Sequence, residues 1–493
     1  MKSKHIAVIG AGVGGLTCAL LLASRGYSVT VYEKRDRVGG RNSQFTLGSY
    51  TFDTGPTFLT MNTILREIFS AAGKNLEDFC EIVPLDPLYR LSFPDCALRV
   101  PADNTALRSE IGRLYPGNEK GFDRYLSYEK KRFERLYSTV QRDFSSLWAY
   151  ISPDMITGIR YLSPGKSLYD VLKRYFTSEQ LRIAFTFQAK YLGMSAREAP
   201  ALFTMLSYME HAFGVDHVRG GLSMLSEGIA EAAGREGAKI YCSTPVKRII
   251  TQRKRAIGIE LADGQKVHCD AVVVNADFGH AATTLFEPGL LRKYAPRRIA
   301  GKKFSCSTFM LYLGLDKQYN EPHHNLIFPG DYWKHVDEVM HQGVASDDMS
   351  IYIRNASAID TSMAPPGHSS LYILVPVPNL LKEPSWDKEK TGFYRRTVLN
   401  KIKERTSMQD LENHIVNERI ITPADWERDY SIYGGATFNL AHTFDQLLYF
   451  RPHNRFDEIS GCYLVGGGTH PGSGLPTIFE SSRISAGLIC RDI

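Results

Sequence analysis

The sequence predicts an α/β fold that begins with a nucleotide-binding βαβ unit, because three features follow one another within the first forty residues. Residues 6–9 are apolar and predict a buried strand that leads into a glycine-rich turn and an apolar helix. A second apolar strand, 29–32, ends in Glu33. This order is typical of dinucleotide-binding proteins: a strand, a glycine turn, a helix and a second strand that ends in an acidic residue.

The glycines of the turn have separate physical tasks. Gly10 allows the tight turn, Gly12 lets the backbone approach a pyrophosphate, and Gly15 lets the helix pack against the sheet. The free N–H groups and the dipole of the helix N-terminus favour the pyrophosphate at that end. Glu33 lies eighteen residues after Gly15. A carboxylate there accepts hydrogen bonds from ribose hydroxyls and repels a 2′-phosphate, so NADP is disfavoured.

The same segment has two competing interpretations. Lys2 and Lys4 precede twenty residues without a charged side chain, a pattern that also fits a signal peptide or a membrane span. Four glycines within this run argue against both, and cleavage would remove the phosphate-binding turn. We therefore expect the segment to fold as part of the protein.

Composition narrows the class of protein. With 493 residues, the chain exceeds one ordinary core, so two or three lobes are expected. The net charge of +6 favours anionic membrane surfaces mildly and is too small to indicate nucleic acid. No two of the eight cysteines lie within fifteen residues, which excludes CxxC motifs and favours a reducing compartment. No metal site is expected, and the pair His323-His324 is interpreted as part of a solvated loop.

Elements downstream suggest a nucleotide domain assembled from distant segments. Residues 61–210 are predicted to be mostly helical, and a helix is expected to end near residue 236. Small strands return after it, including a hairpin around Asp263-Gly264 and a buried strand at 271–276. Near the C-terminus a strand at 462–465 runs into five glycines between Gly466 and Gly474 and then a helix. This loop suits close approach by a ligand, although a connection without a ligand would look similar.

Several motifs spread along the chain carry a family resemblance. They are Gly10-x-Gly12-x-x-Gly15, Glu33-Lys34, Gly39-Gly40-Arg41, Phe52-Asp53-Thr54-Gly55-Pro56-Thr57, Arg219-Gly220-Gly221, Ala276-Asp277, Phe450-Arg451-Pro452 and Thr469-His470-Pro471-Gly472-x-Gly474-x-Pro476. Together they resemble the FAD-dependent amine-oxidase-like superfamily. More narrowly, the sequence is similar to bacterial carotenoid desaturases of the phytoene and dehydrosqualene (diapophytoene) type.

The resemblance implies FAD as the cofactor and a set of residues that bind it. These are Gly10, Gly12, Gly14, Gly15, Glu33, Lys34, Gly40, Arg41, Pro56, Thr57, Val246, Gly468, Thr469, Leu475, Pro476 and Thr477. The four turn glycines would hold the pyrophosphate, Arg41 would lie near the phosphates, and Val246 would offer its backbone to the adenine. A surface salt bridge remains an alternative for Arg41, and a place in the strand core remains one for Val246.

The resemblance also implies a domain division. Residues 1–90, 215–300 and 431–493 would form a Rossmann-like FAD-binding domain from discontinuous segments. Residues 91–214 would form a helical region that faces the substrate and the membrane, and residues 301–430 a mixed substrate domain.

The activity implied is FAD-dependent desaturation of a phytoene- or dehydrosqualene-type precursor by hydride transfer to the flavin. No catalytic acid or base is assigned. An apolar tunnel is expected, with candidate lining residues Phe185, Phe187, Tyr191, Met205, Tyr208, Met209 and Phe213, although ordinary core packing explains them too. Alternatives are a carotenoid oxygenase, isomerase or saturase, a flavin amine oxidase, or a flavin-binding scaffold without turnover.

A polyene substrate would be held in a membrane, so we expect a cytoplasmic protein that associates with the membrane peripherally. Phe144, Leu147, Trp148 and Ile151 are spaced like one face of a helix, with Arg132, Arg135 and Arg142 upstream. This pattern fits an interfacial helix and fits core packing equally well. The oligomeric state is left open.

Overall fold

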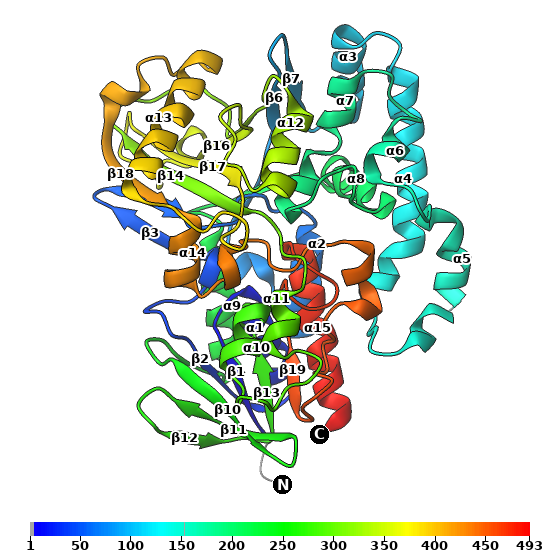
Figure 1. Cartoon of the computed structure of the whole chain (residues 1–493), viewed down its shortest axis with the longest axis vertical. Helices are drawn as coiled ribbons and strands as arrows, with labels where there is room; N and C mark the ends of the chain where they lie inside the picture. The colour runs from blue at the N-terminus through cyan, green and yellow to red at the C-terminus, as the bar shows by residue number, and fades with distance from the viewer. Residues whose placement is uncertain (1–3, 152) are drawn as a thin grey trace.

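Two large β-sheets organise the chain, one parallel and one mainly antiparallel (Figure 1). The computed structural model describes residues 4–151 and 153–493. The parallel sheet has the order β19-β13-β1-β2-β9. Its strands are β1 (His5–Ile9), β2 (Ser28–Tyr32), β9 (Lys239–Tyr241), β13 (Ala271–Val274) and β19 (Cys462–Leu464). Three distant parts of the sequence thus lie side by side, as the small returning strands predicted.

Both faces of the parallel sheet are covered, which explains its nearly continuous apolar strands. Along β1, Ile6 and Val8 enter one core, and Ala7 and Ile9 enter the core on the opposite face. Helices α1 (Val13–Ala23), α2 (Asn62–Ala71), α9 (Ser223–Arg235) and α15 (Leu475–Asp492) pack on the first face.

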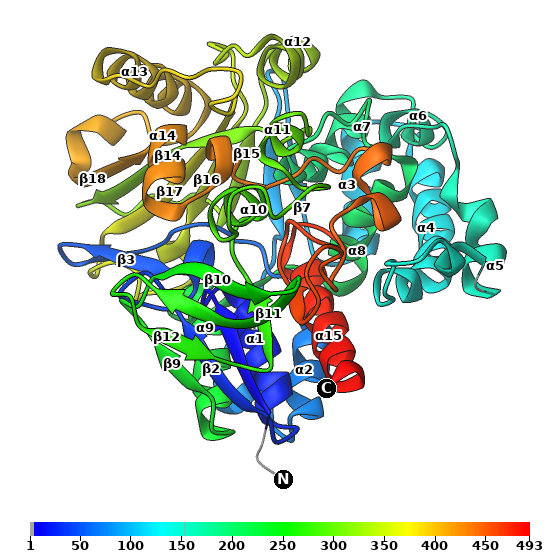
Figure 2. The same cartoon turned by 60° about the horizontal axis from the view of Figure 1, so that its bottom comes forward.

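The second face is covered by a small antiparallel sheet and by further helices (Figure 2). Its strands are β10 (Val246–Gln252), β11 (Arg255–Leu261) and β12 (Lys266–His268), and the helices are α10 (Phe278–Thr284) and α11 (Pro296–Ala300). The predicted hairpin at Asp263-Gly264 is confirmed, because β11 and β12 pair antiparallel across it.

The larger sheet has the order β18-β14-β17-β16-β15-β6-β7. Its strands are β6 (Tyr89–Ser92), β7 (Ala97–Val100), β14 (Ser307–Leu315), β15 (His324–Ile327), β16 (Ile351–Asn355), β17 (Ser369–Val377) and β18 (Ile415–Ile421). Every residue of β14 and β17 is buried. Helix α13 (Lys388–Arg405) packs on one face of this sheet.

A helical region packs against the other face of the larger sheet (Figure 1). It contains α3 (Asn104–Leu114), α4 (Glu119–Val140), α5 (Pro153–Leu162), α6 (Leu168–Leu172), α7 (Glu179–Ala184) and α8 (Thr204–Phe213). The shared core between sheet and helices contains apolar side chains from both, including Tyr312 of β14 and Phe185 after α7.

The remaining short elements connect these layers. They are the hairpin β3 (Gln44–Leu47) and β4 (Tyr50–Asp53), the pair β5 (Ile82–Pro84) and β8 (Asp216–Val218), and the helices α12 (Tyr332–Asp337) and α14 (Pro423–Tyr430). The prediction that residues 61–210 are mostly helical is confirmed by helices α2 to α8, and the exceptions are the short strands β5, β6 and β7. These strands are only three or four residues long; β5 pairs with β8 and β6 with β15, both far along the chain, and β7 pairs with its neighbour β6. The predicted domain boundaries stay predictions.

Candidate cofactor and substrate site

The glycine turn after β1 leaves no room for side chains. Gly10 has a φ of 95°, and its N–H donates to the carbonyl of Tyr32 at 2.8 Å. A Cβ on Gly12 or Gly15 would lie 2.9 Å from Asn275 Nδ2, and one on Gly15 would lie 2.3 Å from the Gly10 carbonyl oxygen. Asn275, which follows β13, donates to that same carbonyl at 3.1 Å. Asn275 therefore supports the turn, a role that sequence reasoning missed because the contact is long-range.

Two helix N-termini meet beside this turn. Gly12 caps α1 and Gly474 caps α15, and neither helix start receives a side-chain cap in the described structure. The helices touch at their first turns, where a Cβ on Gly14 would lie 3.2 Å from Ile478 Cγ2. Ser482 Oγ of α15 donates to the Gly14 carbonyl at 2.8 Å. Uncapped N–H groups and two helix dipoles at one place favour an anion such as a pyrophosphate.

Glu33 is a buried carboxylate at the end of β2, with 5% of its surface exposed. Its Oε2 accepts from the Ala11 N–H at 2.8 Å, and its Oε1 accepts from the Arg35 N–H at 3.0 Å. The Thr244 N–H donates to the Glu33 carbonyl at 2.7 Å, which brings the start of β10 and half-buried Val246 to the same corner. Glu33 thus ties β2 to the glycine turn and keeps acceptor capacity for a ligand.

Lys34 and Arg41 lie in different surroundings. Lys34 is exposed and donates to Ser431 Oγ at 2.6 Å. Arg41 is half-buried and donates to the Thr437 carbonyl at 2.5 Å. Burial lowers the pKa of Arg41, and the nearby Asp277 carboxylate opposes that shift. In the described structure Arg41 thus donates to a backbone carbonyl and forms no salt bridge, and its place near the phosphates stays a prediction.

A buried arginine supports the C-terminal glycine loop, residues 466–474, by hydrogen bonds to its backbone. Arg451 is fully buried and donates to the carbonyls of Gly467 at 2.6 Å and Thr469 at 3.1 Å. Thr469 is buried and donates to the Pro452 carbonyl at 2.5 Å, and a Cβ on Gly468 would lie 2.5 Å from Phe278 Cβ. This loop ends at the first turn of α15, which carries Leu475, Pro476 and Thr477. Arg451 belongs to the Phe450-Arg451-Pro452 motif, but the sequence pattern did not indicate that it supports this loop.

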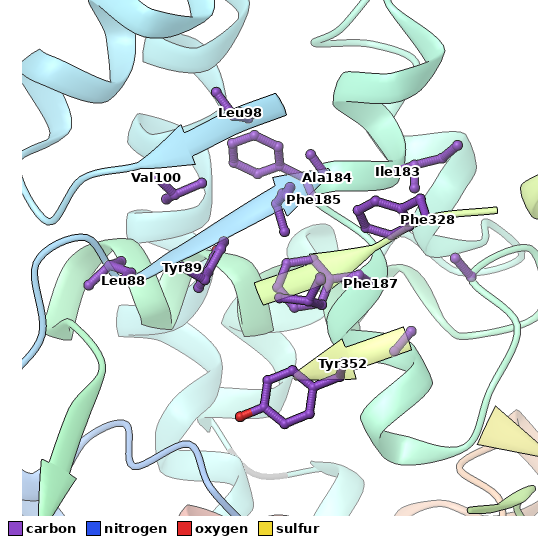
Figure 3. Packing of buried hydrophobic residues seen from close by; sticks show 14 of the residues in the cluster. Leu88, Tyr89, Leu98, Val100, Ile183, Ala184, Phe185, Phe187, Phe328 and Tyr352 are labelled. Carbon is purple, nitrogen blue, oxygen red and sulfur yellow. The ribbon is translucent and has the colours of Figure 1, made fainter. Parts of the chain in front are cut away.

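Pro56 and Thr57 lie where the cofactor segment meets the larger sheet. Thr57 Oγ1 and Tyr352 Oη of β16 are 2.7 Å apart. Tyr352 belongs to the wall of an apolar cavity of about 30 Å³. The lining residues are Phe187, Leu326, Ile327, Phe328, Ser350, Ile351, Tyr352, Leu374, Pro376 and Phe438. Figure 3 shows Phe187 and Tyr352 in this core, between the sheet and the helical region.

The tunnel candidates differ in position. Phe187 lines the cavity. Phe185 and Tyr208 are buried in the same core, and Met209 packs at the edge of another. Met205 is half-buried, and Phe213 is 38% exposed. The side chain of Tyr191 lies outside the described part of the structure.

The prediction of a solvated loop at His323-His324 is wrong, because both side chains are buried. His324 begins β15, and the apolar residues that follow it place the strand inside the sheet. Arg354 Nε donates to His323 Nε2 at 3.2 Å, and its Nη1 forms a buried ion pair with Asp53 at 2.6 Å. Among residues 4–151 and 153–493, no group of acidic, histidine or cysteine side chains forms a metal site.

The predicted interfacial helix is not a single helix. Helix α4 ends at Val140, and Phe144 turns inward against His470 with ring centroids 5.2 Å apart. Leu147, Trp148 and Ile151 belong to a short 3₁₀ turn, η3 (Leu147–Ile151), and are 58%, 78% and 59% exposed. Arg132 is buried in an ion pair with Glu129, so it belongs to no basic face.

The residues present fit a flavin dinucleotide. The uncapped helix starts and side-chain-free turn suit the pyrophosphate, and Glu33 suits a ribose. Thr57 is hydrogen-bonded to Tyr352, and Ser473 of the C-terminal glycine loop donates to the Phe438 carbonyl, so both cofactor segments contact residues that line the apolar cavity. These individual binding roles remain predictions. In the described structure, no helix has the length and apolar character needed to cross a bilayer.

Comparison with known proteins agrees with this geometry. A family model described as flavin containing amine oxidoreductase matches residues 13–490. The chain is 45% identical over 490 residues to a 4,4'-diapophytoene desaturase (4,4'-diapolycopene-forming) from a Methylomonas species, covering 99% of this chain and 96% of the relative. It is 34% identical to an all-trans-zeta-carotene desaturase from Myxococcus xanthus, covering 99% and 94%.

Solved structures agree in fold. Putrescine oxidase bound to putrescine superposes with a TM-score of 0.65 at 16% identity over 99% of both chains. An oxidoreductase from Methanosarcina mazei gives 0.63 at 15% identity, over 99% of this chain and all of the other.

Proposed function

This chain belongs to the flavin-containing amine oxidoreductase family, and we propose that it desaturates a linear C30 carotenoid precursor of the diapophytoene type. It is an FAD-dependent oxidoreductase. The C30 substrate is favoured over a C40 carotene because the diapophytoene desaturase shares 45% identity and the zeta-carotene desaturase 34%.

The observation that carries the proposal is an apolar cavity with a wall residue, Tyr352, that is hydrogen-bonded to the predicted flavin segment. Thr57 touches Tyr352 of the cavity wall, and the lining is otherwise almost entirely hydrocarbon. A volume of about 30 Å³ equals that of about one water. A C30 chain therefore binds only when side chains such as Phe187 and Phe438 move aside. Bound FAD would accept a hydride from an unactivated carbon, which protein side chains cannot do.

Delivery of such a substrate requires contact with a lipid surface. We assign this contact to Leu147, Trp148 and Ile151 of η3, with Ile156 of α5 and Phe450 beside them. These five side chains are each more than half exposed. The Tyr449 N–H donates to Tyr150 Oη at 3.4 Å, so the two segments adjoin. An exposed cluster of large apolar side chains is unusual on a soluble surface and suits peripheral membrane binding.

Expression in a host that accumulates diapophytoene, or phytoene, tests the proposal. We expect diapophytoene to be converted to products with a longer conjugated chromophore, detected by chromatography with absorbance. Unchanged precursor in both hosts, with FAD bound to the purified protein, would overturn it. Products that contain oxygen would instead identify an oxygenase, and products of unchanged hydrogen content an isomerase. Hydrogen peroxide release with an amine would identify an amine oxidase.

A further inference from the structure

Tyr352 and His324 form a hydrogen-bonded pair at the wall of the cavity. Tyr352 Oη lies 2.7 Å from Thr57 Oγ1 and 2.8 Å from His324 Nδ1. Tyr352 is 4% exposed and His324 is fully buried. The ring of Tyr352 lines the cavity from β16, and its hydroxyl points to Thr57 of the predicted flavin segment and to His324 of neighbouring β15.

The surroundings of His324 keep its imidazole neutral. Its ring stacks on Phe58, with centroids 4.2 Å apart and planes 11° apart. Its Nε2 has no hydrogen-bond partner among the described residues. Burial, with further contributions from the nearby Arg354 and His217, holds the pKa of His324 well below its usual range. The titratable and charged groups that face it are Tyr352, His323, Arg354 and His217. A neutral imidazole offers a lone pair for a proton.

A buried hydrogen-bond network holds the Arg354 guanidinium in place near His324. Arg354 Nη1 donates to Asp53 Oδ2 at 2.6 Å, and its Nη2 lies 3.1 Å from His217 Nδ1. Asp53 also accepts from the N–H groups of Leu222 and Ser223 at the start of α9. Because Asp53 ends β4, four residues before Thr57, the network holds the predicted cofactor segment in register with the cavity wall.

We propose that Tyr352 and His324 together accept the proton that leaves the substrate, an inference that rests on the proposed function. Desaturation removes a hydride and a proton from adjacent carbons, and FAD, when bound, takes the hydride with both electrons of its C–H bond. The electrons of the second C–H bond form the new C=C bond. That proton passes to Tyr352 Oη while the phenol's own proton passes to His324 Nδ1.

This transfer requires a defined starting arrangement of protons. His324 carries its proton on Nε2, the phenol donates to Nδ1, and Thr57 donates to the phenol oxygen. The transfer leaves a neutral phenol and an imidazolium, so the charge of the cationic substrate moves onto His324. A positioned acceptor also decides which adjacent C–H bond breaks, whereas an unguided cation can lose a proton from either side.

Two substitutions test the pair in the holoenzyme. Tyr352→Phe removes the hydroxyl, and we expect the new polyene band in a single anaerobic turnover of diapophytoene to appear about 100-fold more slowly, because proton loss follows hydride transfer. His324→Asn keeps a side-chain acceptor near the phenol, but an amide does not take up the proton, so a similar loss is expected. Bound FAD per protein and the flavin absorbance spectrum should stay unchanged in both variants. Tyr372→Phe is the matched control, since this buried phenol lies on neighbouring β17 with its ring 5.9 Å from that of Tyr352 and outside the cavity lining.

A binding measurement tests the same contact without turnover. The probe is a C30 polyene amine whose ammonium N–H replaces the acidic C–H of the cation. We expect the wild-type holoenzyme and Tyr372→Phe to bind this probe at least tenfold more tightly than Tyr352→Phe, measured by fluorescence in detergent micelles. Equal affinity for all three proteins would overturn the proposal.

The outcomes also separate this pair from the proposed function. If the wild-type enzyme converts diapophytoene and both variants match its rate, the pair has no part in proton removal and the inference is overturned. If the wild-type enzyme converts no polyene, the proposed function is overturned and the inference with it.

Discussion

Replacement of Glu33 by alanine separates the two tasks of this side chain. The carboxylate accepts one hydrogen bond from the Ala11 N–H and one from the Arg35 N–H, in a corner that is 5% exposed. Hydrogen bonds to a charged group contribute about 1.5–3 kcal/mol each, so the loss of two costs roughly 4 kcal/mol of folding free energy. With about 2.1 cal/mol/K of unfolding entropy per residue over 493 residues, Tm should fall by about 4 °C.

The second effect of Glu33→Ala concerns the cofactor. Loss of one charged hydrogen bond to a ribose hydroxyl should weaken FAD binding about tenfold to a hundredfold. Calorimetric scans of the apoprotein measure the first effect, and titration of apoprotein with FAD measures the second. Glu33→Gln retains one acceptor oxygen and should lie between. Glu231→Ala, which removes an exposed ion pair with Arg235, is the surface control and should leave both quantities unchanged. Unchanged Tm and unchanged FAD affinity in Glu33→Ala would refute the reasoning.

Three further variants follow from the structure. Gly15→Ala would place a Cβ 2.3 Å from the Gly10 carbonyl oxygen, so the purified protein should lack FAD, whereas Gly487→Ala meets nothing within 4 Å and should retain it. Burial raises the pKa of Glu210 to about 7, so the folded protein keeps a proton that the unfolded chain releases near pH 4.5, and stability falls as pH rises between these values. At pH 8 the free energy of unfolding of Glu210→Gln should therefore exceed that of the wild type by up to about 3 kcal/mol, seen as a higher urea midpoint. At pH 4 the two midpoints should be similar, and a lower midpoint for the variant at pH 8 would contradict this. Trp148→Glu should reduce binding to lipid vesicles at least about tenfold in a sedimentation assay, and undiminished binding would exclude this surface.

Local patterns predicted the nucleotide part of the fold well. The strand–turn–helix at the N-terminus and the Asp263-Gly264 hairpin depend on neighbours in sequence, and glycine positions and apolar periodicity reveal them. The apolar runs of β13 and β19 were recognisable for the same reason. Because continuous apolar runs are typical of strands buried on both faces of a parallel sheet, they also predicted that these strands share one sheet with β1.

The larger sheet and the substrate side were harder to predict. Strand β6 has four residues and forms a local hairpin with β7, but its place in the larger sheet depends on β15, more than 230 residues away, which no local pattern indicates. The burial of His323 and His324 depends on Arg354 of β16 and on the aromatic ring of Phe58. The apolar run that follows His324 was a signal for a buried strand. The support of the glycine turn by Asn275 has no comparable local signal, because the two segments meet only in the folded sheet.

Anaerobic mixing of the FAD-loaded protein with diapophytoene in detergent micelles tests the central claim most directly. The account predicts bleaching of the oxidised flavin absorbance together with a new polyene band of longer wavelength, in a single turnover. A flavin that stays oxidised with diapophytoene and with phytoene, in a protein that binds FAD, would contradict it.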